Sequence, residues 1–167
     1  MISIRKNSKK CFIGRLIIGE KNPILTQSMT NTPTCEVEKT VNQCKQLIEN
    51  DVDLIRITVP TIREIEAIKK IIHQLRSLNY KQPIIADVHF NPKIAEMVAP
   101  FADKVRINPG NFIPSTLSEK QSKKKFQSFD LKLLKTKKLL ELCKNHNTAI
   151  RIGINHGSLD PNIVAQH

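Results

Sequence analysis

The sequence predicts an α/β protein that forms part of a TIM barrel, with about five of the eight strands and an N-terminal β-hairpin. Short apolar runs alternate with helical patterns along the 167 residues, which is typical of a parallel sheet with right-handed crossovers. No Gly-x-Gly-x-x-Gly motif follows the first strand, which disfavours a dinucleotide-binding open sheet. Polar residues follow the apolar runs, at the edge where barrel enzymes place their active sites.

The individual elements are predicted in chain order. Residues 10–19 form two short strands around Gly14 and Arg15, and these strands predict a hairpin. A capping box of Thr61 and Glu64 begins one helix, and Asn91 followed by Pro92 begins another that ends at residue 98. Barrel strands are expected at residues 24–28, 54–59, 83–88, 104–108 and 149–154. The remaining predictions are helices at 34–50, at 131–147 and from 160 onward, and an exposed polar loop at 115–130.

Two parts are expected in this chain. Residues 1–22 are an N-terminal arm and hairpin, and residues 23–167 are an incomplete TIM-barrel domain. A whole barrel needs roughly 200 residues or more, so strands six to eight are expected to be missing here. An open barrel would leave strand edges unpaired, which is an aggregation hazard.

Composition restricts the function classes. The net charge is +12, but the lysines are spread over predicted helices and no aromatic-plus-basic RNA-binding motif occurs, so nucleic-acid binding is not expected. No apolar run approaches the roughly 20 residues of a membrane span. The basic residues 1–10 lack the apolar segment of a secretory signal, so the expected location is the cytoplasm. The four cysteines lack metal-binding spacing, and no metal site is expected in this chain; they are Cys11, Cys35, Cys44 and Cys143.

Candidate site residues stand at the ends of the predicted strands. Side chains two residues apart on a strand point to the same side. That rule pairs Arg56 with Thr58, Asp87 with His89, Arg106 with Asn108 and Arg151 with Gly153, and Asn155 follows directly. The carboxyl ends of barrel strands meet at one mouth, so these polar side chains are expected to converge there.

Charge at this mouth predicts an anionic ligand. Arg56, Arg106 and Arg151 cannot all be neutralised by Asp87, and unpaired buried guanidinium groups are costly. Structural ion pairs are the alternative interpretation. Arginine binds phosphate through bidentate, charge-assisted hydrogen bonds, so a phosphate or diphosphate ligand is favoured. His89 beside Asp87 suggests an oriented imidazole that acts as an acid, a base or a phosphate donor.

Five segments resemble signature blocks of the 4-hydroxy-3-methylbut-2-enyl diphosphate synthase family, in the family's order. They are QSMT at residues 27–30, IRITVP at 55–60, ADVHF at 86–90, KVRINPGNF at 104–112 and RIGINHGSL at 151–159. The larger form of the family, found in plants, chlamydiae and Bacteroidetes-like bacteria, is the form that the chain resembles. One block alone would be weak, whereas five in order are highly specific.

The resemblance implies an iron–sulfur oxidoreductase of the non-mevalonate isoprenoid pathway. Such an enzyme opens the ring of 2-C-methyl-D-erythritol 2,4-cyclodiphosphate by two-electron reduction, with electrons from ferredoxin or flavodoxin. By resemblance, Arg56, Arg106 and Arg151 hold the cyclic diphosphate with help from Asn108 and Asn155. Asp87 and His89 are the implied catalytic pair.

The resemblance also places the [4Fe–4S] cluster in a C-terminal domain whose ligands this chain does not contain, so the chain alone is expected to be inactive. Two alternatives stay open: a pterin-binding barrel similar to dihydropteroate synthase, and a non-catalytic basic binding protein. The sequence does not predict an oligomeric state.

Overall fold

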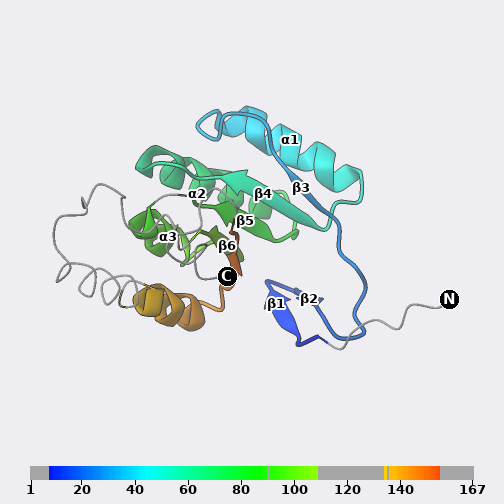
Figure 1. The fold of residues 1–167 in the computed structure, drawn as a ribbon. Helices are drawn as coiled ribbons and strands as arrows, with labels where there is room; N and C mark the ends of the chain where they lie inside the picture. The colour runs from blue at the N-terminus through cyan, green and yellow to red at the C-terminus, as the bar shows by residue number, and fades with distance from the viewer. Residues whose placement is uncertain (1–7, 90, 109–133, 135, 155–167) are drawn as a thin grey trace.

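The computed structural model describes residues 8–89, 91–108, 134 and 136–154. Within them, five parallel strands form one sheet in the order β3-β4-β5-β6-β7. The sheet is open in the described part of the chain, with β3 and β7 at its edges (Figure 1). The strands are β3 (Gln27–Met29), β4 (Leu54–Thr58), β5 (Ile84–Asp87), β6 (Lys104–Ile107) and β7 (Ala149–Ile152). The predicted fold class, a partial barrel of about five strands, is confirmed.

All the described helices pack on one face of the sheet. They are α1 (Val37–Glu49), α2 (Ile62–Ser77), α3 (Pro92–Val98) and the helix at residues 136–145, drawn in orange in Figure 1. Alternate strand residues such as Ile57 and Val105 join helix residues such as Cys44 and Leu139 in one buried cluster. Burial of these apolar side chains is the main force that holds the layers together. The intervening strand residues therefore face the opposite, inner side of the sheet.

The N-terminal hairpin covers the inner side of the sheet where the strands begin. Strands β1 (Cys11–Ile13) and β2 (Leu16–Ile18) pair antiparallel, as predicted. Ile13 is fully buried in a small cluster with Leu54, Ile85 and Ala149. These three residues lie in the first half of β4, β5 and β7. The hairpin therefore leaves the carboxyl ends of the strands uncovered.

The predicted helix starts are confirmed where side chains cap them. Thr61 accepts a hydrogen bond from the Arg63 amide, and Glu64 accepts one from the Thr61 amide at 2.9 Å, which completes the capping box. The Asn91 side chain accepts from the Lys93 amide at 2.9 Å and begins α3, with Pro92 in its first turn.

Two predicted boundaries are wrong by three residues. Strand β3 begins at Gln27 rather than at residue 24, because the Thr26 amide donates to the side chain of Asp53 at 2.8 Å instead of joining the ladder. Helix α1 begins at Val37 rather than at residue 34. The Thr34 hydroxyl donates to the Thr58 carbonyl at 2.7 Å, which holds this residue in the turn before the helix.

Some predictions lie outside the described residues. These are the loop at 115–130, the helix from residue 160 and the side chain of Asn155. Among the described helices, none is long and apolar enough to cross a membrane.

Candidate anion-binding site

Four neighbouring strands bring the predicted site residues together on the inner face of the sheet. Strand pairing places Thr58 beside Asp87, Asp87 beside Arg106, and Arg106 beside Arg151. The parallel register follows from the alternating pattern, since a shift of one residue would turn the buried aliphatic side chains away from the helices. One row of polar side chains therefore crosses the sheet near the carboxyl ends of its strands.

Asp87 is the centre of this row. Its side chain is fully buried, and its Oδ2 atom accepts a hydrogen bond from Arg56 Nη2 at 2.5 Å. Arg106 Nη1 lies 3.5 Å from Oδ1, and His89 Nε2 lies 3.5 Å from Oδ2. A buried carboxylate is stable only with such partners. Asp87 thus orients two guanidinium groups and one imidazole at once.

Because Gly153 has no side chain, the guanidinium group of Arg106 can lie directly against its backbone. Arg106 Nη2 donates to the Gly153 carbonyl at 3.3 Å. A Cβ atom at position 153 would lie 2.1 Å from Arg106 Nε, which is impossible without movement of the guanidinium group. The glycine is therefore required by the close approach of an arginine to the backbone.

Positive charge exceeds negative charge around this row. Asp87 is shared by two arginines, and the Nε atom of Arg56 is buried without a hydrogen-bond partner. Arg151 is exposed, and no carboxylate of the described residues pairs with it. A buried donor that lacks a partner is costly, and a bound anion would satisfy it.

Sequence reasoning missed one cation of the inner face. Lys104 precedes Arg106 by two residues, so the rule that grouped the other candidates would have included it. The lysine is buried at 7% exposure. Burial lowers the pKa of its ammonium group, and the positive charge of Arg151 lowers it further.

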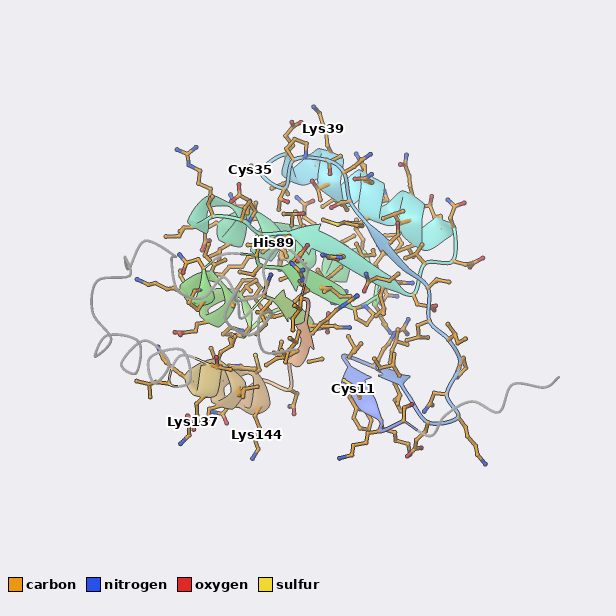
Figure 2. All side chains as sticks on the ribbon, in the orientation of Figure 1. Cys11, Cys35, Lys39, His89, Lys137 and Lys144 are labelled. Carbon is orange, nitrogen blue, oxygen red and sulfur yellow. The ribbon has the colours of Figure 1, made fainter. Side chains whose placement is uncertain are left out.

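The other predicted residues lie beside this row. His89 follows β5 and its side chain is about one third exposed. Asn108 follows β6 and is buried. Figure 2 shows His89 near the sheet and Cys11 in the hairpin, which covers the opposite end of the strands. The structure therefore describes six of the seven residues to which the sequence analysis gives a binding or catalytic role, and all six lie near or after the strand ends of β4 to β7.

The described residues do not fit an iron–sulfur cluster. No group of three or more His, Cys, Asp or Glu side chains among them could hold a metal ion. Cys44 and Cys143 lie on helices and are buried in the cluster between the helices and the sheet, and burial raises the pKa of the Cys44 thiol to about 12. Cluster ligation requires thiolates that converge on one point, which these cysteines do not provide.

The open parallel sheet, with helices on one face and polar side chains at its strand ends, defines an α/β domain of the barrel class. The family model of the GcpE TIM-barrel domain matches residues 8–167, and the chain belongs to this family.

Two relatives of this chain carry the same name. The chain is 40% identical over 167 residues to a protein of Bacteroides fragilis, and 42% identical over 170 residues to one of Chlamydia pneumoniae. Both are named 4-hydroxy-3-methylbut-2-en-1-yl diphosphate synthase (flavodoxin). The matches cover 98% and 99% of this chain but 27% and 28% of the relatives, so the chain spans little more than a quarter of their length.

A solved structure shares the fold at much lower identity. Dihydropteroate synthase from Burkholderia cenocepacia, complexed with 7,8-dihydropteroate, superposes with a TM-score of 0.52 at 17% identity. The match covers 89% of this chain and 64% of that one. At this identity the likeness shows the fold alone.

Proposed function

We propose that this chain supplies the diphosphate-binding wall of a 4-hydroxy-3-methylbut-2-en-1-yl diphosphate synthase. The substrate would be 2-C-methyl-D-erythritol 2,4-cyclodiphosphate, and the reaction its reductive ring opening. Family membership and the names of relatives about 40% identical support this activity. The observation that carries the proposal is the excess of guanidinium groups around a single buried carboxylate.

Each side chain has a role that its position supports. Arg56 and Arg106 are held by Asp87, so their remaining N–H groups are preorganised for anionic oxygens. Arg151 lies beside Arg106 in the register and extends the positive row. Asn108, and Asn155 beyond the described residues, would add neutral donors. The partly exposed His89 would donate a hydrogen bond or a proton to the ligand, with Asp87 as its orienting partner.

Electron transfer belongs to other parts of the protein in this proposal. The family resemblance implies a [4Fe–4S] cluster, which supplies electrons to the substrate when bound, and the relatives' names indicate flavodoxin as the donor. The arginines and asparagines of this chain would bind and orient the diphosphate. Asp87 would hold the guanidinium groups of Arg56 and Arg106 in place.

Calorimetric titration of the full-length protein with the cyclodiphosphate tests this function. Replacement of Arg106 by Met should weaken binding about 10- to 100-fold, which corresponds to the loss of a charged hydrogen bond of roughly 1.5–3 kcal/mol. Arg63→Met is the matched control, because Arg63 is exposed on α2.

Two results would contradict the proposal. Unchanged affinity in the Arg106 variant would remove the arginine row from the binding site. Protection against thermal unfolding by a pterin diphosphate, without protection by the cyclodiphosphate, would favour the pterin-binding alternative.

A further inference from the structure

Lys104 is a buried lysine beneath the arginine row. It is the first residue of β6 and is only 7% exposed. Its neighbours in the sheet are Ile85 on one side and Ala149 on the other. Both neighbours belong to the apolar cluster that the hairpin residue Ile13 covers. The base of the Lys104 side chain therefore lies between two apolar neighbours.

The ammonium group of Lys104 has no counter-charge among the described residues. No hydrogen bond or ion pair joins it to a carboxylate there. The oxygens of Asp87 already contact Arg56, Arg106 and His89. The other carboxylate near the start of β6, Asp103, pairs with Arg76 and accepts from the Ile84 amide. Asp87 is thus committed to other groups through both oxygens, and Asp103 is committed through Oδ2.

Two cations act on the ammonium group of Lys104. Burial lowers the pKa of its ammonium, and the guanidinium groups of Arg151 and Arg56 act in the same direction. Only the weakly acidic thiol of Cys11, on the hairpin, acts in the opposite direction. A lysine that is 7% exposed, unpaired among the described residues and near two arginines is destabilised, and an anion that entered between them would relieve this.

We propose that Lys104 is a further anion-binding residue, which contacts the phosphoryl group that lies deepest between β6 and β7. The inference rests on the proposed function, because it assumes that the arginine row binds a diphosphate. Lys104 lies one step below Arg106 on the same face of its strand, so it would bind the phosphoryl group nearer the hairpin. Arg151 and the free Nε of Arg56 would meet the other oxygens.

Two measurements on the full-length protein test the role of Lys104. Inorganic pyrophosphate is titrated by calorimetry, and thermal unfolding is recorded without ligand. Lys104→Met removes the charge and keeps an unbranched apolar side chain. Lys70→Met, at an exposed position of α2, is the control.

If Lys104 binds an anion, its replacement should lower the affinity for pyrophosphate and raise the unfolding temperature. Lys104→Met should weaken pyrophosphate binding about tenfold, since a charged hydrogen bond is lost. The same change should raise the unfolding temperature without ligand, because an unpaired buried charge is removed. The Lys70 variant should change neither quantity.

Other outcomes overturn the inference. Unchanged pyrophosphate affinity would exclude Lys104 from the site. A lower unfolding temperature, or failure to fold, would mean that Lys104 is a structural ion-pair partner. Arg106→Met separates this inference from the proposed function. If that variant loses pyrophosphate binding and Lys104→Met does not, only the role of Lys104 is wrong. If neither variant loses binding, the proposed function is wrong as well.

Discussion

At the scale of single residues, Asp87 determines how the cations of the site are arranged. Its carboxylate lies between Arg56 and Arg106, which belong to strands on either side of β5. Without this carboxylate, the buried Arg106 and the partly buried Arg56 would repel one another and lose their charged hydrogen bonds. The stability of the fold and the geometry of the site therefore depend on the same side chain.

Asp87→Asn should lower the free energy of unfolding by about 3–5 kcal/mol, as expected when a buried ion pair loses one partner. Saturating pyrophosphate should restore part of this loss, because the anion replaces the missing charge. Urea unfolding with and without pyrophosphate measures both effects. Glu66→Gln is the control, since Glu66 forms only an exposed pair with Lys69. An Asp87 variant as stable as the unmodified protein would show that the pair contributes nothing.

At the scale of elements, the hairpin depends on one glycine in its turn. Gly14 has a φ of +53°, and a Cβ atom there would lie 2.7 Å from Asp103 Oδ1. Asp103 cannot move easily, because its other oxygen accepts from Arg76 and from the Ile84 amide. The turn is thus fixed against the start of β6.

Gly14→Ala should destabilise the protein by about 1–3 kcal/mol, through the left-handed backbone and the contact with Asp103. Arg15→Ala, at the next and exposed turn position, should have little effect. Chemical denaturation of the two variants gives the comparison. Equal stabilities would indicate that the hairpin is not packed against the sheet in solution.

Local chemistry made most elements predictable. The capping box of Thr61 and Glu64 and the Asn91-Pro92 pair mark helix starts through hydrogen bonds between near neighbours in the chain. The starts of β3 and α1 were mispredicted because their determining partners, Asp53 and Thr58, lie more than twenty residues away. Propensity and periodicity do not detect such bonds.

The sequence predicted which candidate residues lie side by side, but it did not predict how they pair. Alternation on each strand identified the polar residues, since side chains two apart share a face. Asp87 forms ion pairs with both Arg56 and Arg106. These pairs depend on the register between strands and on the length of each side chain, and no short segment of the sequence determines the register. Lys104 was missed because it stands at the start of its strand, before the apolar residue that defined the pattern.

At the scale of the whole molecule, one apolar cluster joins the sheet to all the helices in the described part of the chain. Cys44 in α1 and Cys143 in the helix at residues 136–145 both belong to this cluster, although nearly one hundred residues separate them. Their burial raises the pKa of the Cys44 thiol to about 12 and that of Cys143 to about 11. Neither thiol should react while the layers stay together.

Thiol labelling should therefore occur in two stages. Exposed Cys35 should react in the native protein, although its hydrogen bond to Glu64 raises the pKa of its thiol. Cys44 and Cys143 should react only as the cluster opens, and at the same rate if it opens as one unit. Mass spectrometry of the alkylated peptides measures each site. Early labelling of Cys143 alone would show that the helix at 136–145 detaches separately.

Because Asp87 is shared by arginines from two other strands, anion binding should show when these strands have come together during folding. Arg56 precedes Asp87 by 31 residues and Arg106 follows it by 19, and each arrives on its own strand. No single segment of the chain can form this site, because Asp87 meets Arg56 and Arg106 only after β4, β5 and β6 are aligned. During refolding, anion affinity should therefore appear together with the parallel sheet and not with the helices, which can form earlier from local contacts.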